Sequence, residues 1–411
     1  MPYPDIDLNL TDSQKHLRDM VRRFGAEVMR PAGIKLDKLA DPAEVIAKKS
    51  VLWDVFKQFR ALGLHSTGFS KAMGGMAEDM DPMSGILMLE EMGYWDAGLA
   101  ISLGVAGMPF TFCQYLPVPE LQDLARQYVQ DKDCKLVGCW GITEPDHGAD
   151  WSLGGDNPKC GPSLRGVKKG NEYILNGQKS AWVSNGTIAT HSLLHIGLDP
   201  SRGMQGQGIA ICPLDLPGIT RGKPLNKIGQ RPLNQGEIFF DDVHLPEKYM
   251  IMTPRPASEA RQGSGLFTGG GVPMGSMAVM FGGLARAALD EAIKYAQQRI
   301  QGGIPIIEHK NIKLKLFEMF MMTESARSLS RRLQLYNMTS GAASMLHTMA
   351  GKWMSTEVAF KVASEAIQIY GGQGLSKDNL IEKIFRDARA AMIEDGTNEA
   401  LALSVVDNLK D

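Results

Sequence analysis

KLVGCWGITE, residues 135–144, marks the point at which the hydrophobic pattern of this chain changes. Ahead of it, apolar residues recur at helical spacing. The first helix is expected to begin at Thr11-Asp12-Ser13-Gln14, which has the form of a capping box, and two more are expected over 44–62 and 81–96. From residue 135 onward, short runs of β-branched and aromatic residues are bounded by Gly, Pro and Asn, which is typical of strands.

The strands are expected within five runs, 135–144, 172–184, 191–198, 206–215 and 236–246. Asn176-Gly177 stands between two apolar groups inside the second run. Because this dipeptide favours the positive φ angles of a type I′ turn, it predicts a hairpin there.

Helical periodicity returns after the Gly-rich link RQGSGLFTGGGVP, residues 261–273. Long helices are expected around 274–299, 308–338, 343–370 and 378–393. The order of helices, strands and helices predicts an α+β multidomain protein. Its expected parts are an N-terminal helical domain over 1–135, a middle β domain over 136–255 and a C-terminal helical domain over 265–411.

The composition excludes several classes of function. The 44 Lys and Arg residues nearly balance the 46 Asp and Glu residues, so there is no strong field to attract nucleic acid. Five cysteines without a CxxC pair indicate a reducing compartment, and an acidic N-terminus without a signal pattern predicts a cytoplasmic protein. The chain contains neither GxGxxG nor GxxxxGK[ST].

No metal site is expected from the histidines. His191 and His195 make an HxxxH pattern, but on a strand rather than a helix, and no Glu or Cys completes a ligand set. They are interpreted as hydrogen-bonded core or surface residues.

An amphipathic run near the C-terminus, RDARAAMIEDGTNEALAL (386–403), breaks at two adjacent carboxylates, Glu394 and Asp395. By itself such a pair is most often a solvated loop. The alternative is a pair of carboxylates placed for acid–base chemistry, and the surrounding motifs favour it.

Six motifs occur in order along the chain: GCWGITEPDHGAD (138–150), NGQKSAWVSNG (176–186), FDDVHLP (240–246), YAQQRIQGGIPIIEHK (295–310), IQIYGGQG (367–374) and RDARAAMIEDGTNE (386–399). Each is weak alone, but together they resemble the acyl-CoA dehydrogenase family of flavoproteins. The resemblance implies an N-terminal helical domain, a middle β-barrel or sandwich domain and a C-terminal four-helix bundle. It also implies FAD between the β domain and the bundle.

The resemblance assigns cofactor contacts to eleven positions: Trp140, Ile142, Thr143, Trp182, Ser184, Arg299, Gln368, Gly371, Gly372, Thr397 and Glu399. Arg299 resembles the arginine that meets the FAD pyrophosphate from a neighbouring subunit, which implies a homotetramer. Without the other motifs, Trp182 would be read as an ordinary core tryptophan and Gly371-Gly372 as a helix C-cap.

Asp395 falls at the position of the family's catalytic glutamate. It is shorter by one methylene, about 1.5 Å of reach. The family's charged residues at the start of the first bundle helix are also missing, because Gly263 to Gly283 carries no charge. Ala149, a candidate substrate contact, replaces a serine that would touch the thioester or the cofactor.

Three other carboxylates are candidates for the site. Glu394 adjoins Asp395, and Glu90 and Glu91 lie on a helix that lines the acyl pocket in this fold. Both of the latter are favoured as surface residues. If Glu91 instead faces the pocket, with Glu90 beside the substrate, it is placed to take a proton further along a bulky or cyclic acyl group.

The expected activity is FAD-dependent dehydrogenation of an acyl-CoA thioester to an enoyl-CoA. A carboxylate takes the proton, flavin N5 takes the hydride, and an electron-transfer flavoprotein receives the electrons. Two alternatives stay open: a flavoenzyme of altered chemistry, such as an oxidase, monooxygenase or desulfinase, and a non-catalytic subunit of a heteromeric dehydrogenase.

Overall fold

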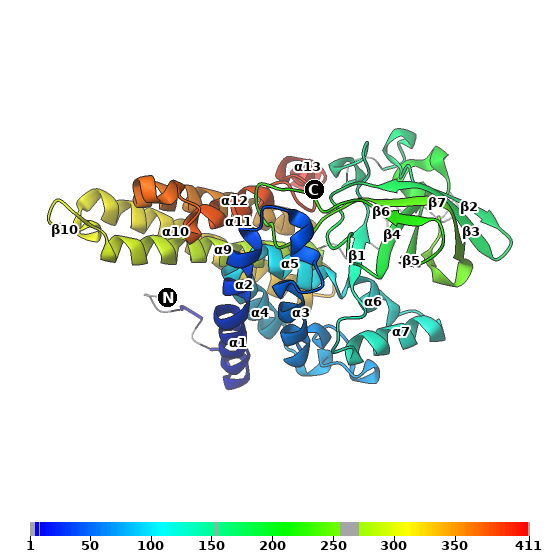
Figure 1. Ribbon diagram of the computed structural model, residues 1–411, viewed down its shortest axis with the longest axis horizontal. Coiled ribbons are helices and arrows are strands. Elements are labelled where there is room, and N and C mark those ends of the chain that lie inside the picture. Colours follow the sequence, from blue (N-terminus) through cyan, green and yellow to red (C-terminus); the bar gives the residue numbers. More distant parts are fainter. Residues whose placement is uncertain (1–4, 8, 153–154, 255–270, 410–411) are drawn as a thin grey trace.

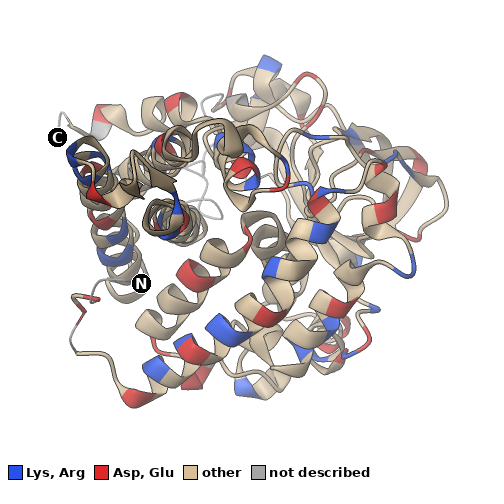
Figure 2. Ribbon diagram, turned by 60° about the vertical axis from the view of Figure 1, so that its left-hand side comes forward, with Lys and Arg blue, Asp and Glu red and all other residues tan. Residues whose placement is uncertain are grey.

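The protein is described by a computed structural model that covers residues 5–7, 9–152, 155–254 and 271–409. Helices come first, a sheet follows, and long helices complete the chain (Figure 1). The expected fold class is confirmed. Basic and acidic residues alternate along the elements, as Figure 2 shows, and neither sign dominates.

The N-terminal part consists of short helices joined by tight turns. They are α1 (Asp12–Phe24), the π-helical turn η1 (Gly25–Met29), α2 (Arg30–Asp37), α3 (Val51–Ala61), α4 (Pro82–Trp95), α5 (Ala97–Val105), α6 (Met108–Cys113) and α7 (Pro119–Gln130). The capping box is confirmed, since Thr11 Oγ1 accepts from the Gln14 backbone N–H at 3.3 Å and Gln14 Oε1 accepts from the Thr11 N–H at 2.9 Å. The helix expected over 44–62 is shorter, because Ser50 caps α3.

The middle part is a single eight-stranded sheet. Its strands are β1 (Gly138–Gly141), β2 (Arg165–Lys169), β3 (Glu172–Lys179), β4 (His191–Gly197), β5 (Gln207–Pro213), β6 (Ile219–Arg221), β7 (Ile238–Pro246) and β8 (Met250–Met252). They are ordered β6-β7-β3-β2-β4-β5-β8, and β1 pairs in parallel with β4. Because β4 also adjoins β2 and β5, the sheet branches there.

The hairpin expected at Asn176-Gly177 is wrong. β3 runs straight through both residues, and its register against β7 shifts there, which marks a β-bulge. Gly177 has φ 135°, and a Cβ at this position would lie 2.9 Å from Cα of Leu164. The dipeptide therefore serves a bulge and a close backbone approach, and the hairpin turn lies between Lys169 and Glu172 instead.

The C-terminal part consists of α9 (Gly271–Gln298), α10 (Lys310–Thr339), α11 (Met345–Tyr370) and α12 (Leu380–Ala391), followed by the short α13 (Asn398–Leu403). The four long helices expected from the sequence are confirmed. Most of the expected Gly-rich link, 261–270, lies outside the described residues. The α9–α10 connection, with β9 (Ile300–Gln301) and β10 (Ile304–Pro305), lies at the far end of the bundle from the sheet (Figure 1).

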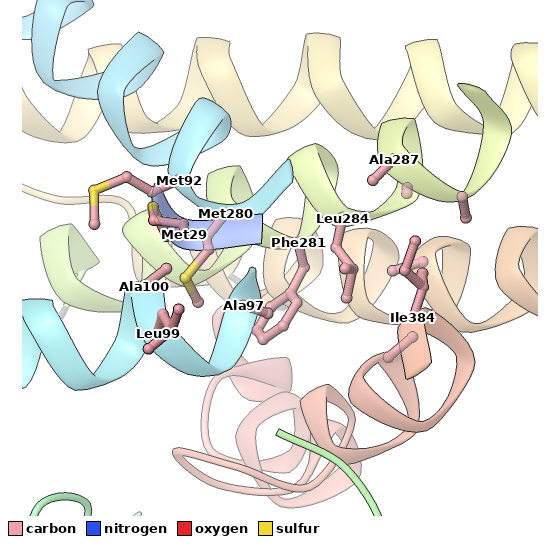
Figure 3. Close-up of a cluster of buried hydrophobic side chains, with 14 of the residues drawn as sticks. Met29, Met92, Ala97, Leu99, Ala100, Met280, Phe281, Leu284, Ala287 and Ile384 are labelled. Atoms are coloured by element: carbon pink, nitrogen blue, oxygen red, sulfur yellow. The ribbon is translucent and has the colours of Figure 1, made fainter. Parts of the chain in front are cut away.

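α9 is the central helix of the protein. It is long and apolar enough to cross a membrane, but 83% of its most apolar window is buried by other helices, as in a soluble core helix. Side chains of α4, α5 and α12 meet it in one cluster (Figure 3) that includes Met92, Met280, Phe281 and Ile384. Methionines fill part of this core, since thioethers adapt to irregular gaps.

α4 touches α9 backbone to backbone. A Cβ on Gly93 would lie 2.0 Å from the carbonyl oxygen of Met280, and one on Gly283 would lie 2.0 Å from that of Glu90. Only glycine permits this approach. It joins the N-terminal helices to the bundle.

Glu90 and Glu91 lie beside this contact, and the expectation of surface positions is wrong for both, since they are 1% and 2% exposed. Glu90 accepts from Arg286 at 2.7 Å, Arg327 at 2.9 Å and Arg331 at 2.7 Å. Burial alone would raise the pKa of Glu90, but the three guanidinium charges outweigh it and lower the pKa. We call these four residues the arginine cluster.

Glu91, next to Glu90 on α4, also pairs with arginines. It accepts from Arg286 at 2.9 Å and from Arg22 of α1 at 2.9 Å. Its ion pairs therefore tie α1 and α9 to α4.

Glu90→Ala is expected to lower the free energy of unfolding by about 3–5 kcal/mol, because it leaves buried guanidinium groups without their shared anion. Urea unfolding at fixed protein concentration measures this. The matched control is Lys71→Ala, which breaks the exposed 2.6 Å pair with Asp79 and should cost less than about 1 kcal/mol. Equal losses in the two variants would contradict a structural role for the cluster.

Candidate active site

The loop between α12 and α13 carries the two adjacent carboxylates. Its backbone is left-handed at Asp395 (φ 53°) and Gly396 (φ 102°), a conformation that costs a non-glycine residue about 1–2 kcal/mol. Fully buried Lys352 of α11 secures the loop, since its Nζ donates to the carbonyl oxygen of Gly396 and to Oδ1 of Asn398, both at 2.9 Å. Strain held in place by neighbouring bonds is common at functional sites.

Glu394 is held from the middle domain. Gln230 Nε2 donates to Glu394 Oε1 at 2.8 Å, and a hydrogen bond to a charged group contributes about 1.5–3 kcal/mol, comparable to the strain at Asp395. Burial and then the charge of Asp395 raise the pKa of Glu394 to about 7. The bond from Gln230 and the charges of Lys352 and Lys227 act in the opposite direction. Glu394 therefore titrates near neutral pH.

Asp395 differs from Glu394 in its bonding to the described residues. Its carboxylate makes no hydrogen bond or ion pair with any residue that the structure describes, whereas Glu394 is bonded. Burial raises the pKa of Asp395, and the charge of Lys352 offsets this in part. A carboxylate with a raised pKa and unused acceptor sites is suited to take a proton from a ligand.

The sequence analysis missed the segment that supports this loop, residues 227–235, which we call the bracing segment. Gln235 Nε2 donates to Ser184 Oγ at 3.2 Å and to the carbonyl oxygen of Trp182 at 3.1 Å. Lys227 Nζ donates to Gln235 Oε1 at 2.7 Å. No sequence signal marks these residues, because polar residues in a loop are usually solvated. The segment links the Trp182–Ser184 turn to Glu394.

The turn after β1 adjoins the Trp182–Ser184 turn. The backbone N–H of Ser180 donates to the carbonyl oxygen of Thr143 at 2.9 Å, which places Ile142 and Thr143 beside that motif. Trp140 Nε1 donates to His195 Nε2 at 3.0 Å, and His195 is fully buried. His195 is thus a hydrogen-bonded core residue, as interpreted from the sequence.

A second group of expected cofactor residues lies apart from the first, at the other end of the bundle helices. Tyr295 and Tyr370 stack with ring centroids 3.9 Å apart, so Arg299, four residues after Tyr295, and Gln368 are brought together. Both are exposed. Gly371 and Gly372 follow directly, and a Cβ at either would meet nothing within 4 Å.

Of the remaining expected site residues, some have a structural role and others are exposed to solvent. Thr397 Oγ1 caps α13 by accepting from the Ala400 N–H at 3.3 Å, and Glu399 is exposed. Ala149 begins the turn η6 (Ala149–Ser152), which contacts α13. Glu91 is occupied by ion pairs with Arg22 and Arg286, so Asp395 and Glu394 are the candidates that the geometry favours.

Most of the chain matches known protein families. Models of the acyl-CoA dehydrogenase N-terminal, middle and C-terminal domains match residues 11–114, 139–243 and 275–410. The chain belongs to the acyl-CoA dehydrogenase family. The resemblance drawn from the six motifs is therefore confirmed.

Similar proteins span nearly the full length. A short-chain-specific acyl-CoA dehydrogenase of Megasphaera elsdenii is 29% identical, over 96% of this chain and 97% of its own. Cyclohex-1-ene-1-carbonyl-CoA dehydrogenase of Geobacter metallireducens is 27% identical, over 95% and 96%. The solved butyryl-CoA dehydrogenase of Megasphaera elsdenii superposes with a TM-score of 0.83 at 27% identity, covering 99% of this chain and 100% of its own.

This acyl-CoA dehydrogenase family member is an FAD-dependent oxidoreductase. Its residues fit the cofactor. Trp182 is 58% exposed beside the partly exposed Ser184, which offers an aromatic face and a hydroxyl to a planar ring. The open backbone at Gly371 and Gly372 suits close approach of a ribose or pyrophosphate.

Glu394→Gln is expected to remove a pH dependence of stability. Because its folded pKa is about 7 against about 4.5 for an exposed glutamate, the stability contributed by protonated Glu394 is fully present below about pH 4.5 and lost as the pH rises through about 7. The wild type should therefore lose about 2 kcal/mol relative to the variant between pH 5 and pH 8. This is less than the full shift implies, because the side chain is partly exposed.

Urea unfolding at a series of pH values measures that difference. Glu357→Gln, an exposed carboxylate on α11, is the control and should follow the wild type. Parallel curves for the wild type and Glu394→Gln would contradict the raised pKa.

Proposed function

We propose that the chain removes hydrogen from Cα and Cβ of an acyl-CoA thioester, with Asp395 as the base. The observation that carries this is the partly buried carboxylate of Asp395, which makes no hydrogen bond or ion pair with the described residues, on a strained loop at the position of the family's catalytic glutamate. The Cα–H bond breaks, its proton goes to a carboxylate oxygen of Asp395, and the electron pair forms the new double bond as hydride leaves Cβ. Bound FAD supplies the hydride acceptor.

The chain's own residues prepare this step in three ways. Lys352 fixes the carbonyl of Gly396 and thereby the direction of the base loop. The partial burial of Asp395 disfavours its charged form, raises its pKa and strengthens it as a proton acceptor. Trp182 and Ser184, fixed by Gln235, present an aromatic face and a hydroxyl on the cofactor side.

We infer that the acyl group is compact and bulky near Cα, such as an alicyclic or branched group. Asp395 reaches about 1.5 Å less than a glutamate would, so a wider acyl group fills the space between base and cofactor. The similarity to a cyclohex-1-ene-1-carbonyl-CoA dehydrogenase supports this proposal, and the similarity to a short-chain enzyme supports the straight-chain alternative.

Anaerobic titration tests the activity and the substrate together. Straight, branched, aromatic and alicyclic acyl-CoAs are added one at a time to the FAD-loaded protein, and the flavin absorbance is followed. We expect bleaching by alicyclic or branched thioesters. Bound FAD that no thioester reduces would favour the altered chemistry of an oxidase, monooxygenase or desulfinase, and a chain without FAD would favour a non-catalytic subunit.

Asp395→Asn is expected to slow flavin reduction by at least about 10³-fold while FAD content stays at the wild-type level, because proton abstraction contributes on the order of 10²–10⁴-fold. Stopped-flow absorbance measures the rate. Glu394→Gln, one residue away, should retain activity within about tenfold. A reversed order of the two effects would make Glu394 the base.

We further propose a cytoplasmic homotetramer that passes electrons to an electron-transfer flavoprotein. Two features support assembly from copies of this chain. Arg299 directly follows α9, at the end of the bundle distant from the sheet (Figure 1), and the stacked Tyr295 and Tyr370 bring the segment of Gln368 to the same end. This suits a cofactor shared between two chains. In addition, α10 exposes apolar side chains at helical spacing, Leu314 at 60%, Phe317 at 63% and Met321 at 53%.

Phe317→Asp is expected to produce smaller species and to lower the FAD bound per chain, because the exposed stripe would then carry a charge and the second chain's Arg299 would be lost from the site. Analytical ultracentrifugation and flavin absorbance measure the two effects. Tyr115→Asp is the control, because Tyr115 is also an exposed aromatic residue (75%) but lies on the N-terminal part. It should change neither the assembly state nor the FAD bound per chain. Unchanged assembly in Phe317→Asp would exclude the α10 stripe as the interface.

A further inference from the structure

The bracing segment, residues 227–235, contacts both sides of the proposed reaction centre. Gln235 bonds Ser184 on the cofactor side at 3.2 Å, and Gln230 bonds Glu394 on the base side at 2.8 Å. Lys227 bonds Gln235 at 2.7 Å, and its charge also acts on Glu394. A single short segment therefore sets the distance between the two sides.

Gln230 is fixed to an unusual degree for a loop residue. Its side chain is 2% exposed and its φ is 48°, a left-handed conformation that is uncommon for a residue other than glycine. Its backbone N–H donates to Oδ1 of Asp387 in α12 at 2.5 Å. A Cβ on the preceding Gly229 would lie 2.2 Å from the carbonyl oxygen of Arg386, so the segment lies directly on α12.

The anchored backbone of Gln230 aims its amide at Glu394. Because Glu394 directly precedes Asp395, fixing the Glu394 side chain restrains the peptide that leads into the left-handed turn of the base. Asp395 is shorter than a glutamate, and misplacement of a reacting group by about 1 Å can cost about 10²-fold in rate. Restraint of this peptide therefore matters more here than it would with a longer base.

We propose that Gln230 is a positioning residue of the dehydrogenation, which acts through Glu394 to hold Asp395 at the thioester and which, with Gln235, keeps the base loop in register with the cofactor side. Gln230 acts in this way only if the chain dehydrogenates thioesters as proposed above. Its side chain is 2% exposed and bonds Glu394, so its effect belongs to geometry and to the protonation of Glu394.

The charges around Glu394 determine the sign of the expected pH effect. Asp395 disfavours its ionised form, whereas Lys352 of α11, Lys227 and the Gln230 amide favour it. Removal of the amide should therefore raise the pKa of Glu394. The carboxylate of Asp387 on α12 faces Gln230 instead, and bonds its backbone N–H.

The test compares Gln230→Leu and Gln230→Glu with the wild type in anaerobic stopped-flow reduction by whichever thioester bleaches the wild-type flavin. We expect a fall of at least about tenfold in the reduction rate per bound flavin. KM and FAD content should change little. The pH profile of stability in urea unfolding, to which Glu394 contributes, should move to higher pH. Gln230→Glu retains the side chain's shape, so it serves if the leucine variant fails to fold.

Gln114→Leu is the matched control. Gln114 is also a buried glutamine, and it bonds the loop at Gly68 and Ser70 in the N-terminal part. Its loss should lower stability without moving the pH profile. The comparison separates the general effect of losing a buried amide from the specific effect of losing the Gln230 amide.

A double-variant cycle tests the route through Glu394. In the Glu394→Gln background, Gln230→Leu should no longer shift the pH profile, because no titrating group remains at position 394. This profile of urea unfolding is independent of turnover. Gln230→Leu should extend the loss of stability to higher pH, and only when Glu394 is present.

Two negative results have different meanings. Gln230 variants that reduce their flavin at the wild-type rate with an unchanged pH profile would overturn the positioning role. A wild type that no thioester reduces would overturn the proposed function instead, and an unfolding profile unchanged by Gln230→Leu would still refute the link between Gln230 and Glu394.

Discussion

The contact between α4 and α9 is the constraint on which the rest of this structure depends. Gly93 and Gly283 allow the two helix backbones to touch, and a side chain at either position would drive them apart. The close approach places Glu90 within reach of Arg286, Arg327 and Arg331. Packed helices and a buried ion cluster then fix the N-terminal helices to the bundle, and the base loop is built at the end of that bundle.

Two carboxylates in this protein, the buried Glu90 and the partly buried Glu394, have opposite properties because their partners differ. Glu90 is surrounded by guanidinium groups, which lower its pKa and keep it ionised. Glu394 has one amide donor, two more distant ammonium groups and a neighbouring carboxylate, and its pKa is raised to about 7. The first arrangement keeps Glu90 ionised and holds the helices together. The second leaves a group that changes charge near neutral pH, which is suited to proton transfer.

The proposed reaction centre is assembled from segments that no local pattern connects. Lys352 of α11 holds the carbonyl of Gly396, while Gln230 of the middle domain holds Glu394. Arg299 and Gln368 lie at the other end of the bundle, which is why we propose a cofactor shared between chains. Stability and reactivity are thus supported by separate polar networks, and substitutions in one need not disturb the other.

The sequence by itself determined the order of helices, strands and helices, because periodicity depends only on local alternation of apolar residues. The six motifs likewise identified the family and predicted Asp395 as the base. Only the tertiary structure decided that Asn176-Gly177 is a bulge rather than a hairpin and that Glu90 and Glu91 are buried, since strand partners and arginines distant in sequence impose both results. The same holds for Gln230, which is buried, and for Lys227, which is partly buried, because contacts between domains that a linear pattern does not contain cover both side chains.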